Sequence, residues 1–270
     1  MIPHPQSRNM KTNILITAVI FLTALPVRSQ TLTIISTFPF RAISARAYAS
    51  DSGDTTPYQI FAGTGLFDSS VTAAAQGYNG TANGIANQNT FLSATDTLLQ
   101  FDGSGHARAT GTFVAPDNKI NYASASSVTD FQFTIDAPFT FSLAADTLTS
   151  GNSPESACYI YVALVQNTAA GNVPIAVNVP IAVFGSSEGR FTGPATGSTQ
   201  GVLEPGTYEF TAEAMASGGG LSATHDFRSE FNSVALSVQS VPEPSSALLL
   251  IAGAAFCLRR LTLRTHEQSA

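Results

Sequence analysis

Bulky apolar and polar residues alternate with a period of two through much of the chain between residues 30 and 240. In the stretches 131–136 and 139–143 every second side chain is bulky, so one face packs inward while the polar residues between meet solvent. This alternation, together with β-branched and aromatic residues, predicts about ten short strands and no capped amphipathic helix. The predicted strands span residues 58–62, 67–75, 97–101, 107–114, 123–135, 138–148, 158–165, 175–184, 206–216 and 224–238.

Residues that favour a tight turn or a positive φ separate these strands. They are Asn79-Gly80, Asn83-Gly84, Asp102-Gly103, Gly151-Asn152, Glu204-Pro205-Gly206 and Gly218-Gly219-Gly220. Short strands with this punctuation predict an all-β fold, an antiparallel β-sandwich of jelly-roll type. Within it, residues 206–215 and 231–238 are expected to close the domain as an antiparallel pair.

The first 29 residues are typical of a secretory signal helix. Arg8 and Lys11 supply a positive start, residues 14–25 form an uncharged apolar run, and small residues precede a cleavage site between Ser29 and Gln30. Met10 offers an alternative start. The exported body is therefore expected to span residues 30–240.

The last thirty residues, 241–270, form a second special segment. Val241-Pro242-Glu243-Pro244 is held extended by its prolines, the apolar run 247–258 follows, and Arg259 with Arg260 ends it. A helix of twelve residues reaches only about 18 Å, short of the roughly 30 Å hydrocarbon core of a bilayer. The segment predicts a short hydrophobic transmembrane helix with a basic cytoplasmic end.

These three parts in this order resemble the PEP-CTERM sorting signal of Gram-negative bacteria. The resemblance covers about a tenth of the chain, and the ten residues after Arg260 are more than such tails usually carry. It implies recognition by an exosortase-type membrane cysteine protease, cleavage near Pro242-Glu243-Pro244, and export in cells that make exopolysaccharide. An ordinary C-terminal membrane anchor is the alternative. A similar tail also occurs, and is sometimes named, at the C-terminus of bacterial ice-binding proteins.

Composition narrows the partners of the body. The whole chain is 44% hydrophobic and 11% charged, which is typical of a folded domain. Six basic and sixteen acidic residues lie between residues 30 and 240, so the net charge there is near −10. Such a surface repels phosphate backbones and anionic lipid, and nucleic acid is not expected as a partner.

Candidate chemistry in the body is sparse, and no cofactor is expected. Cys158 reads as a buried inert thiol, and no disulfide can form within the body. The sequence Gly185-Ser-Ser-Glu-Gly189 matches a nucleophile elbow around Ser187, but the glycines and proline after it favour a hairpin turn. Weaker ideas are a metal site at His106, His225 and Asp226, and calcium at loop carboxylates in residues 51–54 and 96–102. His106 and His225 are each expected in a turn or at a strand end.

The sequence thus predicts a non-enzymatic, secreted or cell-surface protein with a structural or adhesive role in the extracellular polysaccharide or biofilm matrix. Its expected partners are the processing protease, the inner membrane during export, and polysaccharide. The alternative is a carbohydrate-binding module in which tyrosines stack on sugar rings and loop Asp or Asn residues supply hydrogen bonds. Ice binding and hydrolysis are less favoured, because Thr31-Leu-Thr33 and Thr147-Leu-Thr149 are isolated and no two acids are visibly paired.

Overall fold

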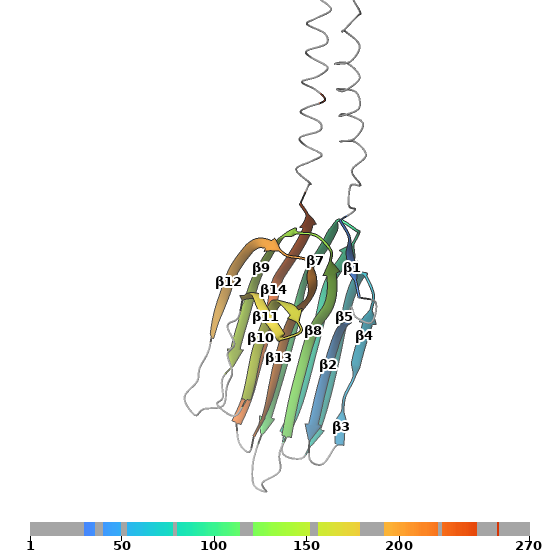
Figure 1. Cartoon of the computed structure of the whole chain (residues 1–270). Coiled ribbons are helices and arrows are strands. Elements are labelled where there is room, and N and C mark those ends of the chain that lie inside the picture. Colours follow the sequence, from blue (N-terminus) through green and yellow to red (C-terminus); the bar gives the residue numbers. More distant parts are fainter. Residues whose placement is uncertain are drawn as a thin grey trace, which may run out of the picture. The chain divides into compact units, whose positions relative to one another are not determined.

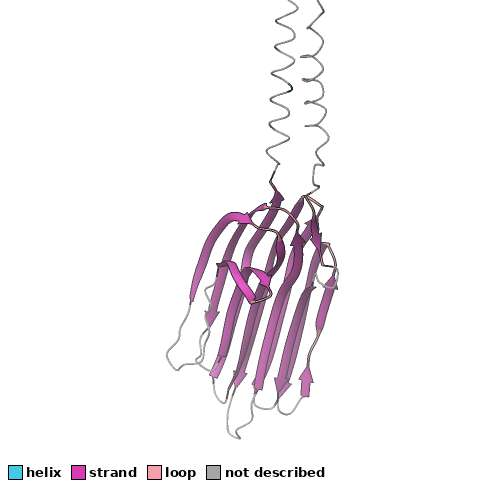
Figure 2. Ribbon diagram, viewed as in Figure 1, coloured by secondary structure: helices cyan, strands magenta, loops and turns pink. Residues whose placement is uncertain are grey.

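The computed structural model describes residues 30–35, 40–49, 53–77, 80–113, 121–151, 156–178, 192–220, 223–241 and 253. From residue 31 to residue 241 these segments build two antiparallel sheets packed face to face (Figures 1 and 2). The predicted all-β sandwich is confirmed. The predicted signal helix (residues 1–29) and most of the apolar run 247–258 lie outside the described residues. Among the residues that are described, no helix is long and apolar enough to cross a membrane.

We call the two sheets sheet A and sheet B. Sheet A has the order β11 (Gly171–Asn178), β10 (Ser156–Thr168), β13 (Gly206–Gly220), β8 (Asn121–Ile135), β2 (Phe40–Ala49) and β3 (Gly53–Thr55), with β1 (Leu32–Ile34) beside β8 and β4 (Tyr58–Ala62) beside β2. Sheet B has the order β12 (Thr192–Leu203), β9 (Phe139–Gly151), β14 (Ala223–Ser240), β7 (Leu98–Phe113), β6 (Gly80–Ala94) and β5 (Gly65–Gly77).

Strands β7 to β14 have the pairing of a jelly roll. β7 pairs with β14, β8 with β13, β9 with β12 and β10 with β11, so the chain folds back on itself as a rolled hairpin. The expected pairing of residues 206–215 with 231–238 is wrong. These residues belong to β13 and β14, which lie in opposite sheets because β13 pairs with β8 of sheet A and β14 pairs with β7 of sheet B.

One half of the core is aromatic. Phe131, Phe133 and Phe210 of sheet A are fully buried, and Phe131 and Phe210 contact Phe101 of sheet B. The ring centroids of Phe101 and Phe210 are 5.1 Å apart, as are those of Phe131 and Phe210. Strands β8 and β9 alternate buried and more exposed residues from end to end, as their sequences predict.

The other half of the core is built from alanine and glycine. Ala45, Ala73, Ala109 and Ala125 are all at most 1 or 2% exposed there, and Gly84 lies among them on β6. A Cβ atom at Gly84 would lie 2.4 Å from the carbonyl oxygen of Ser124 and 2.9 Å from that of Arg46. The backbones of the two sheets therefore touch at this point, and the sandwich narrows from its phenylalanine end to its alanine end.

A fully buried arginine closes the corner between β4 and β5. Arg41 donates from Nη2 to the carbonyl of Gly63 at 2.6 Å, and from Nη1 to those of Gly65 at 2.7 Å and Thr90 at 3.3 Å. Its guanidinium carbon lies 4.6 Å from the centroid of the Phe61 ring. Gly63 and Gly65 have φ of 136° and 100°, which only glycine adopts readily, and they carry two of the accepting carbonyls.

Two predicted turns lie inside strands. Asn83-Gly84 lies within β6 and Asp102-Gly103 within β7, whereas the glycines at 218–220 are the last three residues of β13. Gly84 is there because a neighbouring backbone leaves no room for a side chain, and not because the chain turns. The turn at Glu204-Pro205-Gly206 is confirmed, and the Tyr208 hydroxyl donates to the carbonyl of Glu204 at 2.5 Å to hold it.

The chain enters and leaves the sandwich at the same end. The amide of Leu32 donates to the carbonyl of Asp96, and the amide of Ser240 donates to that of Thr97. Both contacts are to the turn between β6 and β7. The first and last strands are therefore fastened to one connection, at the phenylalanine end of the core.

Candidate functional site

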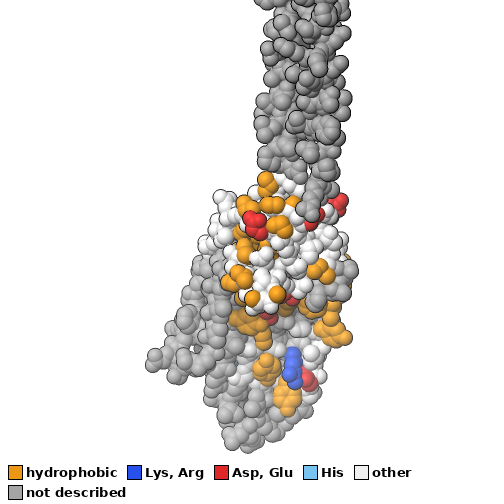
Figure 3. Space-filling view, in the orientation of Figure 1, with side chains coloured by type: hydrophobic (Ala, Val, Ile, Leu, Met, Phe, Trp, Pro, Cys, Tyr) orange, Lys and Arg blue, Asp and Glu red, His pale blue; other side chains and the backbone are white. Residues whose placement is uncertain are grey.

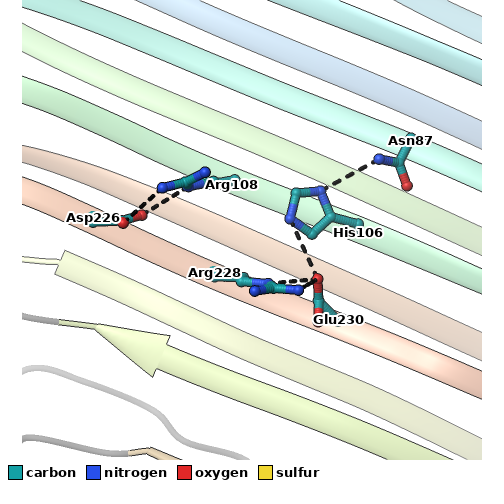
Figure 4. A network of polar contacts seen from close by, with 6 residues as sticks. All are labelled: Asn87, His106, Arg108, Asp226, Arg228 and Glu230. Carbon is teal, nitrogen blue, oxygen red and sulfur yellow. Dashed lines mark hydrogen bonds and ion pairs between the residues drawn. The ribbon is translucent and has the colours of Figure 1, made fainter.

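The strongest concentration of polar chemistry lies on the outer face of sheet B. Alternation along β6, β7 and β14 points Asn87, His106, Arg108 and Arg228 outward, away from the core. Figure 4 shows these side chains with Asp226 and Glu230 across the three strands: Asn87, His106, Glu230 and Arg228 are joined by contacts, and Arg108 with Asp226 forms a separate pair beside them. We call this group the His106 network.

His106 stands at the centre of the network. Its Nδ1 lies 3.5 Å from Nδ2 of Asn87 and its Nε2 lies 3.4 Å from Oε1 of Glu230. Because the amide nitrogen can only donate, Nδ1 accepts and the proton sits on Nε2, facing the carboxylate. Burial lowers the pKa of His106, Glu230 partly offsets this, and Arg228 and Arg108 lower it further. The ring is therefore neutral at neutral pH.

Two arginine–carboxylate pairs hold the surrounding acids in place. Arg228 donates from Nε and Nη2 to Oε1 of Glu230, both at 2.5 Å, and Glu230 is only 7% exposed although it is on the outer face. Arg108 binds Asp226 with two parallel bonds of 2.9 and 2.8 Å. The positive and negative charges of the network are therefore matched locally.

A β-bulge in β14 shapes the surface beside the network. The register of β14 shifts between Phe231 and Val234 against β7, and between Phe231 and Ser233 against β9. Phe231 is fully buried over Gly105, where a Cβ would lie 2.1 Å from the ring. This close packing anchors the bulge and leaves Asn232 and Ser233 exposed on the surface.

Two hollows flank the bulge, each of about 450 Å³. The first is lined by Asn87, Ser104, Gly105, His106, Arg228, Glu230, Phe231 and Asn232. The second lies on the β9 and β12 side and is lined by Ala144, Ala145, Asp146, Thr196, Gly197, Ser198 and Ser233. Their volumes fall in the range of small-ligand sites, and their position on either side of one strand suits an extended ligand.

An exposed apolar platform continues the first hollow along β6. Phe91 is 45% exposed and is paired across the strands with Leu66, which is 61% exposed. On the other side Phe91 faces Asp102, and the next outward pair is Asn89 with Ser104, followed by Asn87 with His106. An aromatic ring is thus followed by carboxylate, amide and hydroxyl groups on a flat sheet surface.

This arrangement suits the binding of a neutral polyhydroxylated ligand. An exposed ring offers an apolar face for stacking, and fixed amide, carboxylate and guanidinium groups offer paired donors and acceptors to neighbouring hydroxyls. The network is held by its own internal hydrogen bonds, so little side-chain freedom is lost on binding.

The outer face of sheet A is different in character, with apolar side chains between a few acids (Figure 3). Asp130 of β8 lies opposite Thr211, between Glu209 and Glu213 of β13. Tyr159 donates to Glu213 at 2.5 Å and Gln132 donates to Glu209 at 3.0 Å. Burial raises the pKa of Asp130 to about 6, and Glu209 and Glu213 raise it as well.

We expect this carboxyl to make the protein less stable as pH rises. The folded state holds the Asp130 proton up to about pH 6, whereas the unfolded chain releases it near pH 4. The free energy of unfolding should therefore fall by about 2 kcal/mol between pH 4 and pH 6 through this group and level off above. Urea titrations of wild type and Asp130→Asn over this range will check it; equal slopes in the two proteins would contradict it.

The metal site suggested for His106, His225 and Asp226 is contradicted by the structure. His225 is 3% exposed and points into the core, where its ring lies 5.7 Å from that of Phe227, whereas His106 and Asp226 point outward. The two histidines lie inside strands on opposite faces of sheet B and cannot share an ion. Of the calcium candidates, Asp54 is bound to Arg46 at 2.8 Å and Asp102 lies in β7. Within the described segments no three His, Cys, Asp or Glu residues are grouped to hold a metal.

Cys158 is where the sequence predicted it. It lies in β10, is 2% exposed, and burial raises the pKa of its thiol to about 11. The predicted sorting and processing residues fall elsewhere. The structure describes Gln30, two residues before β1, and Val241, directly after β14. The other residues, Ser29, Pro242, Glu243, Pro244, Arg259 and Arg260, lie outside the described residues, as does the candidate nucleophile Ser187.

The His106 network was not predicted from the sequence. Asp102-Gly-Ser-Gly-His106 indicated a turn, which hid the alternation Asp102, Ser104, His106, Arg108 on one face of β7. That alternation, together with the same period at Asp226, Arg228 and Glu230, is the sequence signal from which a polar face could have been predicted.

Comparison with known proteins gives no family. No family model matches the chain, and no curated protein matches it in sequence. A chain from the structure of infectious bursal disease virus, Gx strain, aligns over 81% of this chain and 81% of its own, at 8% identity and a TM-score of 0.14. A likeness at this level carries no argument about fold or function.

Proposed function

We propose that this protein is exported to the cell surface, where it is a non-enzymatic adhesive or structural component that holds neutral polysaccharide on the outer face of sheet B. The observation that carries the proposal is the row on β6 and β7 in which exposed Phe91, opposite Asp102, is followed by two cross-strand pairs of polar residues, Asn89 with Ser104 and Asn87 with His106. The net charge near −10 of the body favours a neutral glycan over an acidic one.

The way the chain enters the sandwich supports a tethered role. Leu32 and Ser240 are fastened to the same β6–β7 turn, so a body held through its C-terminal segment is held by one end. The face of sheet B extends away from that end along strands of 12 to 18 residues. A ligand site on this face is then left open to the surroundings.

Glycan binding is expected to depend on Phe91. Its replacement by alanine removes the stacking surface and should weaken binding about five- to thirtyfold, since one such ring contact contributes on the order of 1–2 kcal/mol. Residues 30–240, which hold all the described strands, are screened on an array of neutral glycans, and affinities for the best ligand are then measured by calorimetry. His106→Ala should weaken binding as well.

Tyr58→Ala is the matched control. Tyr58 is also an exposed aromatic, 70% exposed against 45% for Phe91, but it lies on β4 of sheet A. It should bind like wild type. If Tyr58→Ala lost binding and Phe91→Ala bound fully, the site would lie on sheet A. If the protein bound no glycan at all, only the structural role would remain.

The C-terminal segment is proposed to be processed during export. Pro242 and Pro244 keep the site of cleavage extended, Glu243 keeps it outside the bilayer, and Arg259 with Arg260 fixes the depth of the apolar run. The mature protein should end close to Pro244. Mass spectrometry of protein from native cells will identify the last peptide, and recovery of intact residues 262–270 would refute processing.

The same measurement can be made on variants. Glu243→Ala should leave an uncut form in the inner membrane, because the charge that marks the cleavage region is gone. Ser269→Ala, at the far end of the basic tail, should be processed like wild type.

A further inference from the structure

The two sheets differ in how their edges are protected. In sheet A one edge is split into the short strands β3 and β4, with Pro57 between them, and the other edge, β11, contains Pro174 and lies beside a bulge in β10. Short strands, prolines and bulges are the usual devices that prevent an edge from pairing with another chain.

Sheet B lacks these devices along most of its two edges. β5 has 13 residues with one charge, at Asp68, and no proline. β12 has 12 residues with no charge, and after Pro194 it continues from residue 195 to 203 without another proline. Residues 196 and 198–202 are exposed. In the described part of the chain, β5 pairs only with β6 and β12 only with β9.

The order of the strands makes these edges compatible with each other. Sheet B has six strands, each antiparallel to its neighbour, so β12 and β5 run in opposite directions. A second copy displaced sideways, without being turned over, therefore brings its β5 antiparallel to β12 of the first. The strands match in length, with 12 and 13 residues.

We propose that copies of this protein assemble edge to edge, β12 of one copy pairing with β5 of the next, so that sheet B continues from molecule to molecule. The contact uses two different edges, so each added copy covers one free edge and exposes another of the same kind, and the assembly grows as a filament. It goes beyond the proposed function, because glycan binding uses the face of sheet B and needs no second copy.

The outward side chains of the two edges select one register. With Val202 of β12 opposite Leu66 of β5, Gln200 faces Asp68, Ser198 faces Ser70 and Thr196 faces Thr72. These are apolar, amide–carboxylate and hydroxyl pairs, all of which favour antiparallel pairing. Val202 and Leu66 are 56% and 61% exposed in a single copy and would be covered.

Sedimentation of lysine variants tests the proposal on the full chain purified from cells. The wild type should show species that grow with concentration. A β12 variant with Ser198→Lys and Gln200→Lys, and a β5 variant with Ser70→Lys and Thr72→Lys, should each stay monomeric, because charges block one edge. A mixture of the two variants should form dimers and nothing larger, since one intact β12 meets one intact β5.

A variant with Gln100→Lys and Ser142→Lys is the matched control, with the same added charge on exposed positions of central strands. It should assemble like wild type. The proposal is overturned if the wild type stays monomeric up to its solubility limit, or if the β5 variant alone forms dimers, which would mean that β12 pairs with itself.

Disulfide trapping tests the register. In a Cys257→Ser background the remaining Cys158 is buried, so new cysteines react cleanly. Copies with Ser198→Cys mixed with copies with Ser70→Cys should give a cross-linked dimer under mild oxidation, at least about tenfold more than either alone. Thr196→Cys with Ser70→Cys is out of register and should give less; equal yields would refute the register.

Discussion

Replacing Arg41 by alanine is expected to lower the free energy of unfolding by about 4 kcal/mol. The substitution leaves the carbonyls of Gly63, Gly65 and Thr90 without their donor, and each buried unpaired group costs about 1–3 kcal/mol. It also removes the contact with the Phe61 ring and leaves a cavity at the β4–β5 corner. Since domains are stable by only about 5–15 kcal/mol, urea denaturation will show the loss clearly.

Arg46→Ala is the control for Arg41. Arg46 lies five residues along the same strand, but its side chain is 49% exposed and binds Asp54 in solvent. Its removal should leave the denaturation midpoint nearly unchanged. Arg41→Lys should fall between wild type and alanine, because an ammonium keeps the charge but lacks the planar fork that reaches several carbonyls. A midpoint for Arg41→Ala equal to that of Arg46→Ala would show that the corner does not depend on the guanidinium.

Gly84→Ala is expected to cost about 3 kcal/mol, although it adds a single methyl group. The new Cβ would lie 2.4 Å from the Ser124 oxygen and 2.9 Å from the Arg46 oxygen, and both are backbone atoms that cannot rotate away. The two sheets must move apart, which loosens the alanine packing around them. Thermal unfolding followed by circular dichroism will measure the change.

Gly201→Ala provides the comparison for Gly84. In β12 the nearest atom to a new Cβ is Cε1 of the Phe141 side chain, at 2.9 Å, and a ring can shift. This substitution should cost less than about 1 kcal/mol. If the two alanine variants unfold at the same temperature, the sheets are not in direct contact at Gly84.

The fold was predictable wherever alternation was strong. Two phenylalanines at alternate positions mark each of β8 and β9, and the sequence predicted both strands to within a few residues. β2, β6 and β12 were not predicted, because their inward positions include arginine, alanine, glycine and glutamine in place of large apolar residues. Where the sheets nearly touch, the core selects small side chains and the pattern that reveals a strand disappears.

The candidate site was harder to predict than the fold. The residues of the His106 network come from β6, β7 and β14, and β14 follows the other two strands by more than a hundred positions, so only the register brings them together. The sequence analysis grouped His106 with His225. However, side chains in a strand alternate between the two faces of the sheet, so a shift of one position is enough to place a side chain on the opposite face. The sorting motif is a continuous segment, so it can be predicted from the sequence without knowledge of the fold. It stays a prediction.

The position of β14 has a mechanical consequence. This last strand lies in the interior of sheet B and is paired with β7 on one side and β9 on the other. A pull on Val241 directed along the strand loads both ladders in shear, so many hydrogen bonds must break together, whereas a terminal edge strand can be peeled off one bond at a time. If the protein is anchored through its C-terminus and pulled by a bound polymer, the force acts along β14, which is the direction in which the two ladders resist it best.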